Sequence, residues 1–399
     1  MRALLNAPPG FGKSRLIAKL ALRHSPALIF VRSHVEGLQM ARYIKELGGE
    51  PGLLFGRATL CPFKASDSKQ CLELREWGKC RVRSKSLPVI PPTVEEIYSL
   101  GVCPYEALHA SGREKDVIIL PHAYVAKVSN FDVVADLFEE LEFVALDEVH
   151  NFLEVIEVSE VEEYSARFCD SDKRLCLALP LVGRLAKAVG RVLAASASVT
   201  RPFAEVFTYF LGVEYVSVDK LPGEENLIVE AVPLPVRYRT RTTPRMLSAV
   251  EEFVRRAYGE FRKVAVFLPN KELAQLYLKR LSDIPSSDRP LGDVDHVFVT
   301  YYGSPYSEGV NLAVKAGVLV GFPVPNVKSP ELWVKVRLLK KVGFDGYKYG
   351  LLFAAVNHVI QAVGRVARDL QHEEKFVYLV DDRFKSYKHL LPSYLSKAL

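Results

Sequence analysis

The segment 7-APPGFGKS-14 has the residues of a loop that binds nucleotide phosphates. It fits the phosphate-loop pattern with alanine in place of the first glycine, and it joins an apolar run to an amphipathic stretch, as that loop requires. Lys13 would reach the β- and γ-phosphates, and Ser14 would hold Mg²⁺. A plain turn before a helix is the simpler alternative. We predict that ATP is bound by Pro9, Gly10, Phe11, Gly12, Lys13 and Ser14.

The segment 143-FVALDEVH-150 supplies two adjacent carboxylates at the end of an apolar run. Asp147 can bind Mg²⁺, directly or through water, and Glu148 can polarise a water for attack on a phosphate. An exposed acidic turn after a strand is the common alternative, but the phosphate loop earlier in the chain favours chemistry. We therefore predict that Asp147, Glu148 and Lys13 are catalytic.

The segment 361-QAVGRVARD-369 places four residues at the spacing of one helical face: Gln361, Gly364, Arg365 and Arg368. Arginines that face a γ-phosphate stabilise the charge that develops in the transition state. A basic helical face is otherwise usually a solvated surface. We predict catalytic roles for Gln361, Arg365 and Arg368, and contact between Gly364 and the nucleotide.

Four of the six cysteines fall between residues 61 and 103, with the spacing Cys-x9-Cys-x8-Cys-x22-Cys. Zinc sites usually use close Cys-x2–4-Cys pairs, which this stretch lacks. Four thiolates are the full ligand set of a [4Fe–4S] cluster, and zinc or four scattered thiols are the alternatives. The predicted ligands are Cys61, Cys71, Cys80 and Cys103, while Cys169 and Cys176 are expected to be ordinary thiols.

Strands that alternate with helices must position these groups. The predicted strands form two series: Arg2–Asn6, Ala27–Val31, Val117–Leu120, Phe143–Leu146 and Val192–Ala195, then Leu227–Val232, Lys263–Phe267, His296–Thr300, Ala316–Val320 and Phe376–Val380. The predicted helices are Lys13–Arg23, Glu36–Leu47, Leu247–Tyr258, Lys271–Leu281, Glu331–Lys341 and Leu351–Asp369. Such alternation is typical of parallel sheets covered by helices. We expect an α/β protein with domains at 1–205 and 206–399.

Two stretches interrupt the alternation and are predicted to be insertions into the first domain, residues 52–110 and 151–190. The chain has 399 residues and a net charge of +6, which is mildly basic and compatible with nucleic acid as a partner. No apolar run reaches the length of about 18 residues that a membrane helix needs. No signal peptide precedes the phosphate loop, and we predict a cytoplasmic protein.

Together these motifs resemble those of the XPD-like iron–sulfur helicases of superfamily 2, which include XPD, FANCJ and DinG. The resemblance lies in the order of several segments: 28-LIFVRSHVEGLQ-39, 116-DVIILPHAYV-125, the acidic box 147–150, Ser196-Ala197-Ser198, 303-GSPYSEGVNL-312, 321-GFPVP-325 and 381-DDRF-384. The family carries its cluster between the segment that grips the single strand, here residues 28–39, and the acidic box. Its last cysteine commonly precedes Pro-Tyr, as Cys103 does here.

The resemblance implies two RecA-like motor domains, with a cluster insertion in the first, that hydrolyse ATP and move 5′ to 3′ on single-stranded DNA in DNA repair. It adds Glu308 to the nucleotide site and implies a monomer that acts on single strands or forks. The candidate strand contacts are Arg32, Ser33, His34, Asn270 and Ser304, and the candidates for stacking on bases are Tyr124, Tyr301 or Tyr302. A purely structural role is the alternative for each of them, since tyrosines also bury well in a core.

Two departures from the family pattern have consequences. The aromatic and glutamine segment that helps to seat adenine is missing before the phosphate loop, so we expect weaker selection of adenine. The stretch available for the family's helical arch, residues 152–195, suffices for two or three short helices. We therefore expect a reduced arch, low processivity and a protein partner that replaces it. The alternative functions are a strand-stimulated ATPase that remodels or senses damaged DNA, and a non-enzymatic cluster protein.

Overall fold

The computed structural model describes residues 1–82, 94–126, 134–138, 140–158, 166–172, 174–304, 306 and 312–399. Every strand predicted from the sequence is present, and its ends differ from the prediction by at most one residue. The strands gather into two separate parallel sheets, which confirms the predicted α/β class. Within the described ranges, no helix is long and apolar enough to cross a membrane.

The first sheet has seven parallel strands in the order β3-β4-β2-β5-β8-β1-β9. Its strands are β1 (Arg2–Asn6), β2 (Ala27–Val31), β3 (Pro51–Leu53), β4 (Val117–Pro121), β5 (Phe143–Leu146), β8 (Arg191–Ser196) and β9 (Glu214–Ser217). Side chains alternate between two cores, as a strand requires. On β2, Ile29 and Val31 pack with α1 (Lys13–Arg23) and α2 (His34–Glu46) on one face. Leu28 and Phe30 join the core that contains α9 (Ala178–Ala188) and α10 (Ala204–Leu211) on the other.

The second sheet has six parallel strands in the order β10-β15-β14-β11-β13-β12. They are β10 (Leu227–Val232), β11 (Lys263–Leu268), β12 (Ser286–Ser287), β13 (His296–Tyr301), β14 (Ala316–Val320) and β15 (Lys375–Val380). One face is covered by α11 (Pro244–Phe261) and α12 (Lys271–Arg280), and the other by α14 (Phe353–Val366). The chain ends in the short helices α15 (Arg383–Ser386) and α16 (Ser393–Ser396).

The first sheet continues past the predicted domain end at residue 205, because β9 pairs with β1. The division between the two sheets therefore lies between residues 217 and 227. β9 is short, and its residues alternate between exposed and half-buried positions at the edge of the sheet. An edge strand of this kind has no continuous apolar run, which is why the sequence pattern does not reveal it.

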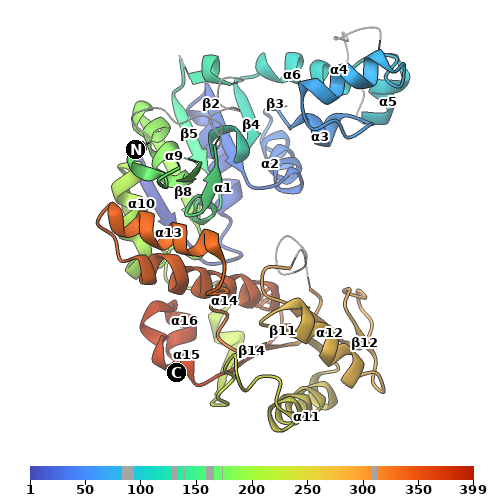
Figure 1. The fold of residues 1–399 in the computed structure, drawn as a ribbon, viewed down its shortest axis with the longest axis vertical. Helices are drawn as coiled ribbons and strands as arrows, with labels where there is room; N and C mark the ends of the chain where they lie inside the picture. The colour runs from blue at the N-terminus through green and yellow to red at the C-terminus, as the bar shows by residue number, and fades with distance from the viewer. Residues whose placement is uncertain are drawn as a thin grey trace.

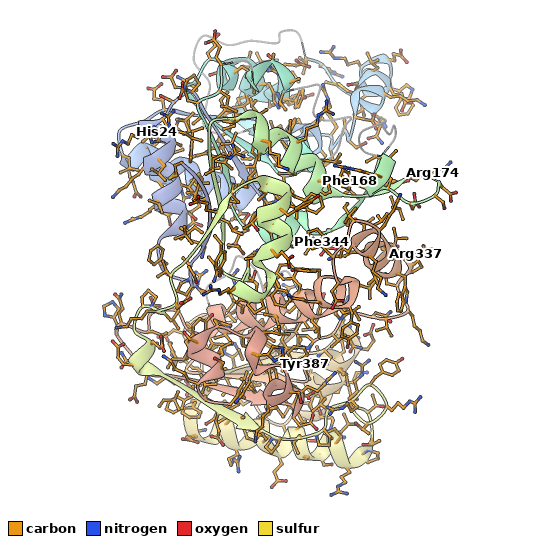
Figure 2. All side chains as sticks on the ribbon, turned by 90° about the vertical axis from the view of Figure 1, so that its left-hand side faces the viewer. His24, Phe168, Arg174, Arg337, Phe344 and Tyr387 are labelled. Carbon is orange, nitrogen blue, oxygen red and sulfur yellow. A yellow bond between two sulfur atoms is a disulfide. The ribbon has the colours of Figure 1, made fainter. Side chains whose placement is uncertain are left out.

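A shared apolar core joins the two domains. Phe353 of α14 packs against Phe203 and Phe207 of the first domain, with ring centroids 5.1 Å and 5.6 Å apart. Phe344 lies where the lower domain meets the first-domain helices (Figure 2), and its ring is 5.8 Å from that of Phe210. The buried Lys335 of α13 (Pro330–Lys341) forms an ion pair of 3.0 Å with Glu154. These contacts join the two domains in the arrangement that the structure shows.

The cysteine-rich stretch forms a lobe beside the β3 edge of the first sheet, at the upper right of Figure 1. Its helices are α3 (Arg57–Leu60), α4 (Ser68–Glu76), α5 (Val94–Ser99) and α6 (Pro104–Arg113). The lobe joins the sheet closely, since an ideal Cβ at Gly52 would lie 2.1 Å from the carbonyl oxygen of Gly112. Among the described residues of the lobe, the hydrophobic cluster between its helices is small and contains the buried Ile97, Val102 and Ala107. Helices with so little apolar contact need another source of stability.

Residues 151–190 contain a hairpin rather than helices alone. β6 (Val155–Glu157) pairs with β7 (Leu175–Leu177), and the hairpin reaches outward toward Arg174 at the right of Figure 2. The predicted reduced arch stays a prediction. The prediction that Cys169 and Cys176 are ordinary thiols is wrong, because they form a disulfide. They are seven positions apart and face each other as an isolated antiparallel bridge beside the hairpin, which places their side chains side by side.

The disulfide should stabilise this hairpin measurably. Replacing both Cys169 and Cys176 with serine is expected to lower the free energy of unfolding by about 2–3 kcal/mol, because a closed loop restricts the unfolded chain. Urea titration of both proteins measures the difference. Alkylation of the unfolded, unreduced protein should label only the four remaining cysteines of the six, and labelling of all six would contradict the disulfide.

Candidate active site between the two domains

The predicted phosphate loop connects β1 to α1 with two glycines in the left-handed region. Gly10 has a φ of 80° and Gly12, which precedes α1, has a φ of 93°. An ideal Cβ at either position would touch nothing, so backbone conformation rather than space requires glycine here. The Lys13 amine donates to the carbonyl oxygens of Ala7 and Pro8 at 2.9 Å and 3.3 Å. The loop is thus folded around the lysine at the start of a helix, the arrangement that receives phosphate.

The acidic box lies beside this loop. The Ser14 hydroxyl donates to Oδ2 of Asp147 at 3.2 Å, so the two predicted Mg²⁺ ligands are adjacent. Glu148 occupies the left-handed region with a φ of 49°, which turns the chain sharply after β5. Burial and the neighbouring Glu148 charge raise the pKa of Asp147. A bound cation would stabilise the ionised form of this buried carboxylate. The oxygen donors of Ser14 and Asp147 are of the kind that Mg²⁺ prefers.

Of the two carboxyl groups of Asp147 and Glu148, that of Glu148 is the one that stays ionised. Burial acts to raise the pKa of Glu148, but the contact with His150 and the charges of Lys13 and Arg365 outweigh it and hold the pKa low. The His150 Nδ1 atom lies 3.1 Å from Glu148 Oε2. A carboxylate that stays ionised can accept a hydrogen bond from a water molecule, as the predicted role demands.

His150 also connects the acidic box to the segment Ser196-Ala197-Ser198. Its Nδ1 atom lies 2.9 Å from the hydroxyl oxygen of Ser196, at the end of β8. That oxygen accepts a hydrogen bond from the backbone N–H of Ser198 at 3.1 Å. All three residues are buried. This chain of contacts runs from Glu148 through His150 to the loop after β8, and it was not predicted because it depends on which strands are neighbours.

The predicted arginine face lies on α14, opposite the phosphate loop. An ideal Cβ at Gly364 would lie 2.6 Å from Cγ of Pro9, so α14 and the loop are in direct contact. Burial and the neighbouring Arg368 lower the pKa of Arg365 to about 10, which leaves its guanidinium charged at neutral pH. Gln361 is half-buried. The structure thereby brings both halves of the predicted site together, while Glu308 lies outside the described residues.

The Gly364 contact predicts a sharp effect of one methyl group. Replacing Gly364 with alanine is expected to push α14 away from the phosphate loop and to lower ATP turnover by about ten- to a hundredfold, because small displacements of reacting groups are costly. Steady-state ATPase assays measure this change. The matched control is Gly259→Ala on α11, where the new Cβ would touch nothing, and it should leave turnover unchanged. Equal turnover in both variants would show that the contact is irrelevant to catalysis.

The chain is similar to helicases in part of its sequence and in its fold. Residues 245–398 match the family model of the helicase C-terminal domain. The structure titled "XPD_Helicase" superposes with a TM-score of 0.71 at 16% identity, covering 98% of this chain and 94% of that one. The chain has the fold of an XPD helicase. A structure of S. tokodaii Xpd4 gives a TM-score of 0.61 at 16% identity, covering 97% of this chain and 93% of that one. No curated protein matched the chain in sequence.

In the XPD fold, the predicted strand contacts lie at the carboxyl ends of strands, but several have structural roles. Ser33 caps α2 by accepting from the Glu36 backbone N–H at 3.3 Å, and Asn270 caps α12 by accepting from the Leu273 N–H at 3.0 Å. Ser304 is buried and lies 2.8 Å from the Thr300 hydroxyl. Arg32 is exposed and His34 half-buried.

Two of the three tyrosines that are candidates for stacking on bases are buried. Tyr124 and Tyr302 are each only 6% exposed, and the Tyr302 hydroxyl donates to the carbonyl oxygen of Gly321 at 3.2 Å. Both rings belong to the core, so they cannot stack on a bound base in this conformation. Tyr301 is half-buried against the core of the second sheet.

The four predicted cluster ligands come together in the lobe. Cys61, Cys71, Cys80 and Cys103 are all unpaired and half-buried, and all line one cavity. The Arg57 guanidinium donates to the Cys71 sulfur at 3.4 Å. Among the described residues, no group of three or more His, Cys, Asp or Glu side chains is placed to hold a metal ion. Four cysteine thiolates are the ligand set of a four-iron cluster, and they are also that of a structural zinc ion.

Proposed function

We propose that the protein is an ATP-dependent helicase or translocase of the XPD-like iron–sulfur type that acts on single-stranded DNA. The contact between Gly364 on α14 and Pro9 in the phosphate loop carries this proposal. It places a basic helical face of the second domain against the nucleotide loop of the first. Two RecA-like domains that meet around a nucleotide can convert its hydrolysis into relative motion, because cleft closure depends on the bound state.

Each predicted residue then has a chemical task. Lys13, released from the loop carbonyls, would bind the β- and γ-phosphates, while Ser14 and Asp147 would hold Mg²⁺, which neutralises phosphate charge. Glu148 would orient the attacking water, and its low pKa keeps it ionised for this task. Arg365 and Arg368 would stabilise the developing charge from the second domain. We also assign Gln361 and Glu308 to this site on the strength of the family resemblance.

The chain of contacts from Glu148 to the loop after β8 supports coupling between hydrolysis and movement. A change in hydrogen bonding at Glu148 alters the partners available to His150, and through it those of Ser196. The same loop leads to Thr200, whose hydroxyl donates to the carbonyl oxygen of Leu390 in the second domain at 3.0 Å. The nucleotide site is therefore linked through buried groups to a contact between the domains.

We propose that Cys61, Cys71, Cys80 and Cys103 hold a [4Fe–4S] cluster. The cavity that all four line and the small apolar core of the lobe support this assignment. The bound group would stabilise the lobe, since metal binding contributes directly to the folding of small domains. The lobe could then act as a rigid wedge where a duplex opens.

The resemblance further supports 5′ to 3′ movement, a role in DNA repair, a cytoplasmic location and a monomer. The short insertion at 151–190 supports a protein partner that completes the channel around the strand. Each of these assignments is a proposal that depends on the helicase function itself.

Two assays on one sample test the proposed function: ATP hydrolysis with and without single strands, and displacement of a labelled strand from a fork. Stimulated hydrolysis with displacement supports a helicase. Stimulated hydrolysis without displacement would instead identify a remodelling ATPase. Absence of hydrolysis by the wild-type protein, with strand present, would overturn the proposal in favour of a non-enzymatic cluster protein.

A further inference from the structure

A basic segment, residues 237–245, follows β10 and leads into α11. Its sequence, 237-RYRTRTTPR-245, holds four arginines and one tyrosine and no acidic residue. The predicted motifs do not include it. Figure 1 shows α11, which follows the segment, along the bottom of the second domain.

The strand register shows at which edge of the second sheet this segment lies. Val232, the last residue of β10, pairs with Val380 of β15, which pairs in turn with Val320 of β14. β11 and β13 end at the same level, because Leu268 pairs with Tyr301. The basic segment therefore lies at the carboxyl edge of the second sheet, the edge that also carries the predicted strand contacts Asn270 and Ser304.

Contacts with neighbouring loops bring the segment close to Asn270. An ideal Cβ at Gly321 would touch Pro269 at 3.0 Å and Val236 at 3.4 Å, so the residue before Asn270 and the residue before the segment share one neighbour. Arg237 forms ion pairs of 3.1 Å and 2.6 Å with the carboxylates of Asp381 and Asp382. This arginine fixes the segment to the loop after β15.

Local hydrogen bonds then order the rest of the segment. The Thr240 hydroxyl donates to the carbonyl oxygen of Pro235 at 3.0 Å and accepts from the backbone N–H of Arg237 at 3.1 Å. The backbone N–H of Arg241 donates to the carbonyl oxygen of Arg237 at 2.9 Å. An ordered segment of this kind presents its charged side chains with a smaller loss of entropy on binding than a disordered one.

The remaining three arginines have no acidic partner among the residues that the structure describes: Arg239, Arg241 and Arg245. Other arginines of the same domain are paired, as Arg255 is with Glu251 and Asp283. The segment therefore concentrates uncompensated positive charge at one edge of the sheet. Such a concentration attracts a polyanion, because phosphates can supply the missing partners.

Tyr238 adds a stacking surface between these charges. Its side chain is 71% exposed, and the Arg241 guanidinium lies 4.6 Å from the ring centroid. The cation holds the ring in place from one side, while most of the ring surface remains open to solvent. An exposed aromatic ring among arginines is the combination that binds single-stranded nucleic acid, where bases are free to stack. A duplex offers no such free base.

We infer that the basic segment 237–245 binds single-stranded DNA, with Arg239, Arg241 and Arg245 on phosphates and Tyr238 stacked on a base. It extends the strand path along the carboxyl edge of the second sheet, beyond the contacts predicted at Asn270 and Ser304. The inference rests on the proposed function, since it assigns further residues to the same strand.

The test uses the full chain and a fluorescent single strand, with binding measured by anisotropy at several salt concentrations. The variant is R239Q/R241Q/R245Q. Its matched control is R256Q/R262Q/R289Q, which removes the same charge from exposed arginines elsewhere in the second domain. Loss of three phosphate contacts should make the slope of log affinity against log salt shallower by about 2, at about 0.7 per contact. The control should keep the wild-type slope.

A second pair of variants isolates the ring. Y238A is expected to weaken strand binding by about five- to a hundredfold, whereas Y238F, which keeps the stacking face, should bind like the wild type. At a saturating concentration of single strand, all variants should hydrolyse ATP at the wild-type rate. Weaker binding should instead raise the strand concentration that gives half of the maximal stimulation. This inference alone is overturned if the R239Q/R241Q/R245Q variant keeps the strand affinity and salt slope of a wild-type protein that binds the strand and hydrolyses ATP. A wild-type protein without strand-stimulated hydrolysis overturns the proposed function instead.

Discussion

Replacing Lys13 with alanine is expected to lower strand-stimulated ATP hydrolysis by about a hundredfold or more. Removing one preorganised charge from a site of phosphate transfer typically costs about this much, because the charge acts where negative charge develops. The lysine amine donates to the loop carbonyls of Ala7 and Pro8, at 2.9 Å and 3.3 Å, and the residue is half-buried. The substitution therefore removes the predicted catalytic charge without opening the core.

The matched control is Lys19→Ala. Lys19 lies on the same helix α1 and is exposed, so its loss changes net charge equally without touching the phosphate loop. Thermal melting should show both variants folded, and both should bind a labelled single strand, since neither substitution touches the predicted strand contacts. Hydrolysis by Lys13→Ala at the rate of Lys19→Ala would contradict the assignment of the phosphate loop.

The sequence predicted the central strands because they depend on local pattern, and the same kind of pattern suggested the residues of the candidate site. β2 and β14 are fully buried apolar runs, and the phosphate loop requires a fixed order of glycine, lysine and serine. The edge strand β9 lacks such a run and was missed. Local pattern therefore identifies what the interior of a sheet requires, and it says less about its edges.

Pairings that depend on how the chain turns and packs were beyond this kind of prediction. The disulfide joins residues only seven positions apart, but it depends on the turn between them, which brings Cys169 opposite Cys176. The contact of Gly364 with Pro9 depends on how two domains pack, and a glycine within a helix carries no local signal of its partner. Tyr302 was assigned to bases but lies in the core, because its position after β13 does not determine which way the ring turns.

The second large effect concerns the lobe that carries the four cysteines. The purified wild-type protein, kept free of oxygen, is expected to contain about four iron atoms and four sulfides per chain, because four thiolates complete the ligand set of one such cluster. Replacing Cys80 with serine should abolish stable iron binding. It should also loosen the lobe, since the buried cluster shared by its described residues holds only Ile97, Val102 and Ala107. Iron and sulfide analysis with limited proteolysis measures both effects.

The matched control is the double substitution of Cys169 and Cys176 by serine, which removes two other cysteines and should keep the full iron content. The Cys80→Ser protein should retain basal ATP hydrolysis, because the lobe joins the first sheet at the β3 edge while the phosphate loop follows β1, near the opposite edge. It should lose strand displacement if the lobe opens the duplex. Zinc without iron in the wild-type protein would overturn the cluster assignment, and it would leave the nucleotide site between the two domains untouched.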